Sequence, residues 1–280
     1  MSDTNDLTAA KDLLPRIQVT GDNLGYEVCR YCGKHLPYRR ITMFGQTRAL
    51  ADLCDCKESQ IARDKELLDE IRAKNMAETV ARLYESSGIK RKYMGCTLDN
   101  YDTEGDPRKV KALLTAQRYV ETFGDRESKG EGLYIHGGNG TGKTHLVSGI
   151  AHALIQRGVS VTCSTYSVML LNIRDRVANG YSEMDAISRY IRSRLLVIDD
   201  LGKEKPTEWS LAALYNIINM RYEDAKPTII TANYGYNGLT RALTPGDSDD
   251  DRIRAIVSRL MESTYLLYFD WDDNRRRCDE

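Results

Sequence analysis

The sequence predicts an α/β fold in which helices cover a parallel sheet, and three observations predict it. From Gly132 onward, short apolar stretches alternate with stretches whose apolar residues recur at helical spacing. A glycine-rich motif at residues 137–144 directly follows the first apolar stretch. A later apolar stretch ends in Asp199 and Asp200, as expected of a buried strand that carries polar groups to a ligand crevice. Parallel strands need crossover connections, so the alternation places helices on both faces of the sheet.

The alternation also gives the expected positions of the elements. We expect strands at residues 132–137, 159–165, 195–199, 228–232 and 264–269, and helices at 143–157, 166–178, 183–192, 207–223 and 251–262. Ahead of the sheet, a stretch rich in Lys, Glu, Arg and Ala predicts a long connecting helix over about 57–87, and residues 107–123 predict another helix. The polar residues 1–25 predict a loose tail, and residues 245–251 predict an acidic loop.

Composition limits the class of protein. The 280 residues can form one large domain and a small one, and 41% hydrophobic with 29% charged residues is ordinary for a globular protein. The net charge of −1 means that any nucleic-acid contact must come from local basic patches. Since no apolar run approaches about 20 residues and the N-terminus is polar, we expect no membrane association and a cytoplasmic location. An odd number of cysteines, seven, argues against a disulfide framework.

Residues 137–144, Gly-Gly-Asn-Gly-Thr-Gly-Lys-Thr, satisfy the phosphate-loop pattern G-x-x-x-x-G-K-[ST] between a predicted strand and a predicted helix. Glycines let the backbone wrap a phosphate with its N–H groups turned inward, and the helix N-terminus adds positive potential. Both flanks argue against the alternative, a glycine-rich turn beside a surface lysine. The motif therefore predicts a nucleoside triphosphate site. Its expected contacts are Gly137, Gly138, Asn139, Gly140, Thr141, Gly142, Lys143 at the β- and γ-phosphates, and Thr144 at Mg²⁺.

Carboxylates that follow a buried strand complete the predicted site. Asp199 is expected to hold the Mg²⁺ hydration shell, and Asp200 to orient or deprotonate the attacking water. The alternative for this pair is a helix cap or a turn. The strand begins about 50 residues after the phosphate loop, a spacing typical of such nucleotide-binding folds.

Three further polar residues are candidates with open alternatives. Asn233 ends the strand at 228–232 and would bond the γ-phosphate or position the water, although Asn is also a common turn residue. Arg259 lies on the predicted helix at 251–262, where a guanidinium could stabilise phosphoryl charge on a neighbouring subunit or make a surface salt bridge. Arg275 is a second such candidate, or part of a solvated basic tail.

Four of the cysteines form two close pairs near the N-terminus, Cys29-x₂-Cys32 and Cys54-x-Cys56. Two short knuckles joined by a hairpin supply the four tetrahedral thiolates that Zn²⁺ prefers, and metal binding would explain how a segment with few large apolar residues folds. His35 could replace one cysteine. Free thiols or a redox pair are the alternatives. Cys96, Cys163 and Cys278 are expected to be ordinary buried or tail residues.

The order of these motifs resembles the AAA+ helicase loaders of the DnaC/DnaI type and their IstB-like relatives. The resemblance covers about residues 88–280. It is carried by Ser87-Gly-Ile-Lys-Arg-Lys-Tyr-Met-Gly-Cys-Thr-Leu-Asp-Asn-Tyr101, the phosphate loop, Leu195–Gly202, the strand end at Asn233, Arg259, and the ending Phe-Asp-Trp-Asp-Asp-Asn-Arg. The DnaI-like loaders are similar in having an N-terminal zinc-binding domain, whereas the DnaC-like and IstB-like chains do not match there.

The resemblance implies an AAA+ ATPase that uses ATP, Mg²⁺ and Zn²⁺. It implies sensor 1 for Asn233, the arginine finger for Arg259 and sensor 2 for Arg275. The Asp199-Asp200 pair departs from the commoner Asp-Glu, and the shorter carboxylate at Asp200 predicts slow hydrolysis. A loader-specific helical insertion would carry Arg174, Arg176, Arg189, Arg192 and Arg194, which could contact DNA phosphates or form a solvated face balanced by Asp175, Glu183 and Asp185.

The expected organisation has three parts: a tail and zinc-binding, helicase-interacting domain at 1–56, a helical linker at 57–88, and the ATPase domain at 89–280. The function implied is loading of the replicative hexameric helicase onto single-stranded DNA, with self-association through the ATPase domain. Two alternatives stay open. One is a transposition helper ATPase acting on duplex DNA; the other is a zinc-dependent DNA-binding regulator whose ATPase is a switch.

Overall fold

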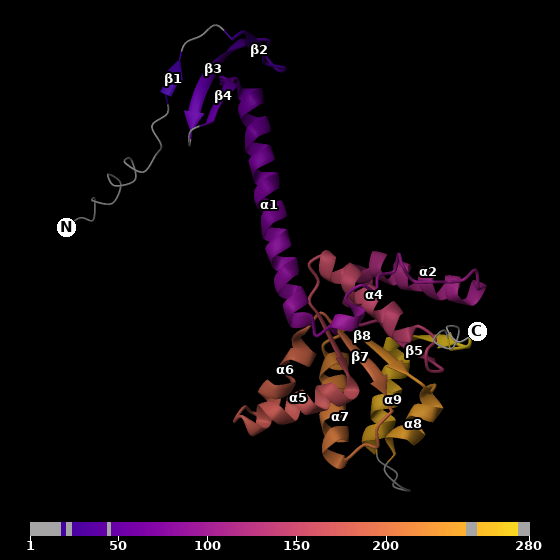
Figure 1. Ribbon diagram of the computed structural model, residues 1–280. Helices are drawn as coiled ribbons and strands as arrows, with labels where there is room; N and C mark the ends of the chain where they lie inside the picture. Colours follow the sequence, from indigo (N-terminus) through magenta and orange to yellow (C-terminus); the bar gives the residue numbers. More distant parts are fainter. Residues whose placement is uncertain (1–17, 21–23, 44–45, 245–250, 274–280) are drawn as a thin grey trace, which may run out of the picture. The chain divides into compact units, whose positions relative to one another are not determined.

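The computed structural model describes residues 18–20, 24–43, 46–244 and 251–273, and the chain divides into two compact units, Met1–Asn75 and Met76–Glu280 (Figure 1). Most of the predicted tail, nearly all of the predicted acidic loop, Arg275 and Cys278 lie outside the described residues. Among the described residues, no helix has both the length and the apolar character needed to cross a bilayer.

The first unit contains a small antiparallel sheet. Its strands are β1 (Gln18–Thr20), β2 (Tyr26–Val28), β3 (His35–Met43) and β4 (Gln46–Ala51), and the long strand β3 pairs with each of the other three. Only Cys29, Leu36 and Cys54 form a buried apolar cluster among the described residues of this unit. So small a core cannot by itself stabilise a sheet of this size, which makes the contribution of the cysteines important.

The helix α1 (Lys57–Ser87) has the predicted bounds, and the boundary between the two units falls within it. Near its end, Val80, Leu83 and Tyr84 pack against the core of the second unit. A short 3₁₀ turn, η1 (Arg91–Tyr93), follows.

The second unit contains a five-stranded parallel sheet. The strands β5 (Gly132–Gly137), β6 (Val161–Thr165), β7 (Leu195–Leu201), β8 (Thr228–Ala232) and β9 (Thr264–Phe269) lie in the order β6-β7-β8-β5-β9. All pairings among them are parallel. The predicted parallel sheet is confirmed, and the order places the ends of β7 and β8 next to the phosphate loop after β5.

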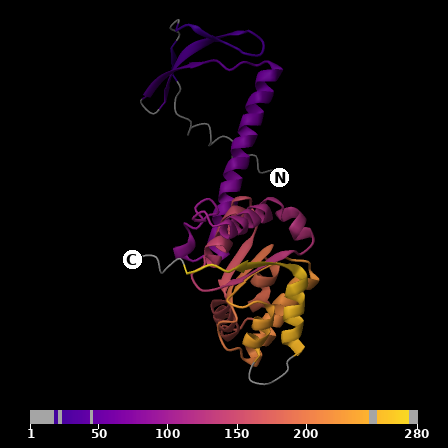
Figure 2. The same ribbon diagram turned by 90° about the vertical axis from the view of Figure 1, so that its right-hand side faces the viewer.

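Helices cover both faces of this sheet, as predicted (Figures 1 and 2). Side chains alternate along each strand: Leu133 and Ile135 face a cluster with the helices Pro107–Glu121 and Lys143–Gln156, whereas Tyr134 faces a cluster with the helices between residues 166 and 263. The bounds are α2 Pro107–Glu121, α3 Phe123–Ser128, α4 Lys143–Gln156, α5 Tyr166–Ala178, α6 Glu183–Arg192, α7 Glu208–Glu223, α8 Tyr236–Leu243 and α9 Asp251–Ser263.

Two helical features differ from the prediction. The helix expected at 107–123 ends at Glu121, and a separate short helix, α3, follows. The helix α8 was not predicted. Its eight residues include Gly238 and follow Gly235, so its composition resembles a loop, but Leu239 and Leu243 are fully buried, and this burial stabilises the helix.

Candidate nucleotide site and cysteine cluster

The phosphate loop connects β5 to α4, which begins at Lys143. Gly142 precedes the helix with φ +91°, a left-handed conformation that favours glycine. At Gly137, a Cβ atom would lie 2.1 Å from the carbonyl oxygen of Phe269 on β9, so no larger residue fits. These two glycines let the loop turn tightly over the sheet edge and leave the first turn of α4 directed at the space where a phosphate would bind.

Lys143 is the most enclosed charged group of the loop. Its side chain is buried, and Nζ donates to the carbonyl oxygens of Gly137 at 2.8 Å and Gly138 at 2.6 Å. Nζ also donates to Oδ1 of Asn233, at 3.3 Å, and the Asn233 amide in turn donates to Oδ1 of Asn139 at 3.2 Å. The structure therefore brings Lys143 and Asn233, predicted from separate motifs, into direct contact.

Asp199 lies beside Thr144. The Thr144 hydroxyl is 3.2 Å from both carboxylate oxygens of Asp199, and Thr231 on β8 donates to Oδ1 at 2.5 Å. Burial raises the pKa of Asp199, while the two hydroxyl donors oppose that rise. A hydroxyl and a carboxylate side by side are hard oxygen ligands, which suit Mg²⁺.

Asp200 adopts a backbone conformation that is rare outside glycine, with φ +60°. Its N–H donates to Oγ1 of Thr231 at 2.9 Å instead of to the sheet ladder, and the β7–β8 register shifts between Ile198 and Leu201. The Asp200 carboxylate accepts from Nζ of Lys203 at 3.0 Å. Backbone strain of this kind is concentrated at functional sites, and here Asp199 and Asp200 both line a cavity beside the phosphate loop.

Two neighbouring cavities surround these groups. One, of about 290 Å³, is lined by residues 139–145 with Lys92, Tyr93, Cys96, Asp200 and Lys203. The other, of about 280 Å³, is lined by Asp199 and Asp200, by residues 163–165, and by part of the segment at 88–93. Lys92, Tyr93, Thr144 and Asp200 line both, so a ligand on the phosphate loop has room to extend toward the segment ahead of α2.

That segment is held against the first turn of α4. His145 Nε2 lies 2.9 Å from Oδ1 of Asn100 and 3.1 Å from the carbonyl oxygen of Thr97. The Tyr101 ring meets the His145 ring edge-on, with centroids 5.3 Å apart. The sequence segment that precedes the predicted ATPase core is thus part of the wall of the site.

The residues after β9 also reach the loop. Trp271 is buried and donates from Nε1 to the carbonyl oxygen of Thr141 at 2.8 Å. This contact closes the loop from the C-terminal side. Arg275, only four residues further, lies outside the described residues, and its predicted role stays a prediction.

Arg259 lies elsewhere. It is on α9, it lines neither of the two cavities, and its guanidinium stacks on the rings of Tyr215 and Tyr222 of α7. Arg259 therefore lies outside the walls of the candidate nucleotide site, and its predicted role as an arginine finger stays a prediction.

The arginines of α5 and α6, together with Arg194 just after α6, have mixed surroundings. Arg194 makes two hydrogen bonds to the Glu127 carboxylate, and Arg189 donates to the carbonyl oxygen of Ser86. Arg174 and Arg176 stack on the rings of Trp209 and Tyr181. Arg194 therefore has a structural role, whereas the others keep part of their donor capacity.

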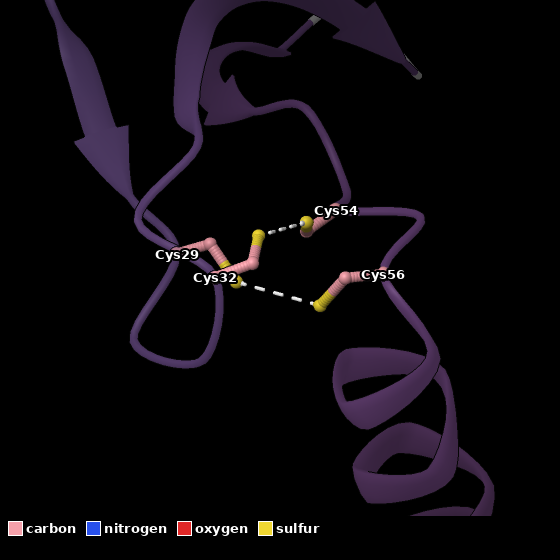
Figure 3. A group of neighbouring side chains, drawn as sticks. All are labelled: Cys29, Cys32, Cys54 and Cys56. Atoms are coloured by element: carbon pink, nitrogen blue, oxygen red, sulfur yellow. Dashed lines mark hydrogen bonds between the residues drawn. The ribbon is translucent and has the colours of Figure 1, made fainter.

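The four N-terminal cysteines converge, as Figure 3 shows. Their sulfur atoms all lie within 4.8 Å of one another, with Cys32 and Cys54 at 3.4 Å and Cys29 and Cys56 at 3.9 Å. All four are free thiols, too far apart for disulfides. Ligands about 2.3 Å from a tetrahedral zinc ion have sulfur atoms about 3.8 Å apart, so the donor set fits Zn²⁺.

Local structure holds these thiols in place. The turn at Cys29 closes through hydrogen bonds with Lys34 and Gly33, and the backbone N–H groups of Cys32 and Tyr31 lower the pKa of Cys29 to about 6. On the other side, the N–H of Ser59 in the first turn of α1 donates to the Cys56 sulfur at 3.4 Å. His35 stacks on the Tyr26 ring and is not among the residues of the group. Cys163 is a free thiol whose pKa burial raises to about 12.

Sequence reasoning missed two residues of the nucleotide site. Thr231 contacts both aspartates of β7, and Lys203 pairs with Asp200. Thr231 is the one polar side chain in the middle of an apolar stretch, Ile-Ile-Thr-Ala, and a buried hydroxyl needs a partner. The need for a partner could have identified Thr231 from the sequence, whereas no feature of the sequence points to Lys203.

Comparison with known proteins places this geometry among ATP-binding proteins. Residues 39–278 match the family described as IstB-like ATP binding protein. The chain is 29% identical over 207 residues to the "Replicative helicase loader DnaC" of Buchnera aphidicola, covering 73% of this chain and 79% of that protein.

Solved structures agree. A crystal structure of the DnaC helicase loader matches with a TM-score of 0.55 at 27% identity, covering 64% of this chain and 99% of that one. A crystal structure of DnaI matches with a TM-score of 0.56 at 25% identity, covering 68% and 95%. The predicted AAA+ fold and the resemblance to the DnaC/DnaI type are confirmed.

Proposed function

The chain belongs to the family of IstB-like ATP-binding proteins, and on this premise we propose that it is an ATPase that loads the replicative hexameric DNA helicase onto single-stranded DNA when replication begins. The observation that carries the proposal is the convergence of Lys143, Thr144, Asp199 and Asn233 at one edge of the sheet. Relatives of this fold named helicase loaders support the choice of partner.

Each group has a role at the nucleotide. The Lys143 ammonium would exchange its two carbonyl partners in the loop for the β- and γ-phosphates of ATP, and Asn233 would follow it as a sensor of the γ-phosphate. Thr144 and Asp199 would hold Mg²⁺, which neutralises charge that develops on the phosphates. The remaining contacts would come from Gly137 to Thr141 and Gly142.

Asp200 would orient the attacking water. Its ion pair with Lys203, at 3.0 Å, would hold the carboxylate until the pair breaks, and its short side chain would limit its reach to the water. Slow hydrolysis follows, which suits a protein that uses ATP as an assembly switch more than as a source of rapid turnover.

Self-association would supply a further cation to the nucleotide site. Arg259 of one chain would contact the γ-phosphate bound by a neighbour, so that hydrolysis requires self-association. Arg275 would act as the second sensor.

The N-terminal part would bind the helicase. We assign residues 1–56 to a zinc-binding domain held by Cys29, Cys32, Cys54 and Cys56, residues 57–88 to a helical linker, and residues 89–280 to the ATPase domain. Zinc would supply folding energy that the small apolar core among the described residues of this part does not provide.

Co-purification with the replicative helicase of the same host tests the proposal. The full chain with ATP should form a complex with that helicase and retain it on single-stranded DNA, whereas Lys143→Ala should not. Capture of a transposase and binding to duplex DNA, without helicase, would instead support a transposition helper. Sequence-specific duplex binding that depends on the four cysteines would support the regulator.

A further inference from the structure

A third cavity, of about 280 Å³, opens between the outer face of α2 and the edge strand β9. We call it the α2–β9 pocket. It shares no residue with the two cavities at the phosphate loop. Its lining residues are Lys111, Leu114, Thr115, Arg118, Tyr119, Arg126, Leu133 and Tyr265.

The helix side of the pocket follows from the pattern of α2. Ala112, Ala116, Tyr119 and Val120 are buried against the sheet. Lys111, Leu114, Thr115 and Arg118 are spaced i, i+3, i+4 and i+7, so they share another face of the helix, where Leu114 is 58% exposed. Seven residues separate the two cations, which places them about 10 Å apart along the helix axis.

The strand side presents an aromatic ring. Because β9 is the last strand in the sheet order, nothing pairs with its outer edge among the described residues, and the Tyr265 side chain is 65% exposed. The Arg126 guanidinium lies 5.7 Å from the centroid of the Tyr265 ring. Arg126 also pairs with Glu131 at 2.7 Å, so its charge is partly neutralised.

Lys111 and Arg118 differ from Arg126, whose charge Glu131 partly neutralises. Within the residues that the structure describes, neither side chain makes a hydrogen bond or an ion pair, and no carboxylate lines the pocket. Three cations therefore gather in one hollow of a chain whose net charge is −1. A local concentration of positive charge creates an attractive potential for an anion even when the whole protein is nearly neutral.

We propose that the α2–β9 pocket binds single-stranded DNA, with Lys111 and Arg118 on successive parts of the phosphate backbone and a base stacked on Tyr265. Grooves of cations with exposed aromatic rings are the usual means of binding a single strand without sequence preference. An acidic protein segment would satisfy the cations, but it gives no reason for an aromatic ring that is 65% exposed beside them. The pocket adds a DNA contact to the proposed loader function and rests on that function for the choice of DNA.

Fluorescence anisotropy with a labelled oligothymidine tests the pocket on the full chain. Lys111→Gln with Arg118→Gln should weaken binding at least tenfold at low salt. Removing two phosphate contacts should also make the slope of log K against log salt shallower by about 1.4, because each contact to a single strand contributes about 0.7. The matched control, Lys65→Gln with Lys74→Gln on α1, removes the same charge from exposed positions and should leave the slope unchanged.

Variants of Tyr265 distinguish the contribution of base stacking from that of charge. Tyr265→Ala should weaken binding without a change in the salt slope, and Tyr265→Phe should bind like the parent chain, because a phenyl ring still stacks. Unchanged affinity and slope in both the double variant and Tyr265→Ala would overturn the pocket.

The same variants distinguish failure of the pocket from failure of the loader function. If they bind DNA normally but lose the helicase, the pocket contacts protein and the proposal is wrong, although the loader function stands. If the parent chain binds duplex and not single-stranded DNA, both proposals fail. If Arg174→Gln or Arg192→Gln alone abolishes binding and the pocket variants do not, the strand runs only over α5 and α6.

Discussion

The guanidinium carbon of Arg259 lies 5.5 Å from the centroid of the Tyr215 ring. The ring of Tyr222, two helical turns further along α7, lies 5.7 Å from the same carbon. Nε of Arg259 is buried and has no hydrogen-bond partner among the described residues. An arginine held by ring faces keeps its charge and most of its donors available, which fits a group that waits for an anion from another chain.

Arg259→Ala should leave ATP affinity unchanged and reduce hydrolysis in the assembled complex at least about tenfold, since arginine fingers contribute up to about 10⁵ in rate. Titration with a fluorescent ATP analogue and steady-state phosphate release measure the two quantities. Turnover that stays the same in the assembled state would show that Arg259 has only a structural role.

A pair of variants on α7 serves as control for that result. Tyr215→Phe with Tyr222→Phe keeps both ring faces and should preserve turnover, whereas the corresponding leucine pair should lower turnover without a change in ATP affinity. A loss of ATP affinity in the leucine pair would indicate general damage to the domain.

Lys143→Ala should abolish ATP binding. The ammonium is the buried cation of the loop, and Gly137, Gly138 and Asn233 each supply an acceptor to it. Isothermal titration with ATP measures the effect, and Lys205→Ala, which removes an exposed lysine that lines neither cavity at the loop, is the matched control. Retention of parental affinity by Lys143→Ala would refute the phosphate-loop assignment.

The sheet could be predicted from the sequence because its signals are local. Four of the five strands are short, mostly apolar stretches, the exception being β6 with its sequence Val-Thr-Cys-Ser-Thr, and β5, β8 and β9 have the predicted bounds. The helix α8 could not be predicted, because what stabilises it is burial of Leu239 and Leu243 against distant elements, which no local pattern of eight residues reveals.

The same division between local and non-local signals applies to the nucleotide site. Lys143, Thr144, Asp199 and Asn233 follow strand ends, and parallel strands bring their ends to one edge. The pairing of Asp200 with Lys203 depends on a left-handed backbone at Asp200, and nothing in the letters Asp-Asp-Leu-Gly specifies that conformation. The position of Arg259 depends on how α9 packs on α7, which is equally non-local.

The cysteine cluster should hold about one zinc ion per chain. Cys54→Ser should release the metal and unfold the first unit, because Cys54 is one of three residues in the buried apolar cluster that the described part of this unit contains. Atomic emission spectroscopy measures the metal, and Cys163→Ser, at a free thiol remote in sequence from the group, is the control. A metal-free chain whose N-terminal part resists proteolysis would contradict the zinc assignment.

Arg221 should prove essential to the stability of the ATPase domain. Its guanidinium is fully buried and donates to Oγ1 of Thr228 and to four backbone carbonyls, those of Tyr190, Ile191, Ser193 and Pro227. These groups belong to the end of α6 and to the segments that lead into β7 and β8. One side chain therefore satisfies the acceptors of three chain segments.

Arg221→Met keeps most of the volume but leaves those acceptors buried without donors, and we expect a loss of about 3–5 kcal/mol in the free energy of unfolding. Urea denaturation followed by circular dichroism measures it. Arg192→Met, at an exposed arginine of α6, should change stability by less than about 0.5 kcal/mol. Equal effects of the two substitutions would mean that water satisfies the carbonyls in the variant.

Asp106 should make the stability of α2 sensitive to acid. It caps the helix by accepting from the N–H of Arg108 at 2.8 Å, and the Arg108 side chain lowers the pKa of its carboxyl from 3.8 to about 2. A carboxyl with a depressed pKa in the folded state stabilises the protein fully above its ordinary pKa, and that contribution is lost as the pH falls from about 4 to about 2.

Asp106→Asn keeps a capping oxygen but removes the charge. The difference in free energy of unfolding between the parent chain and this variant should therefore shrink over that interval, as measured by urea denaturation at each pH. Parallel curves would show that the ion pair with Arg108 does not stabilise the folded state.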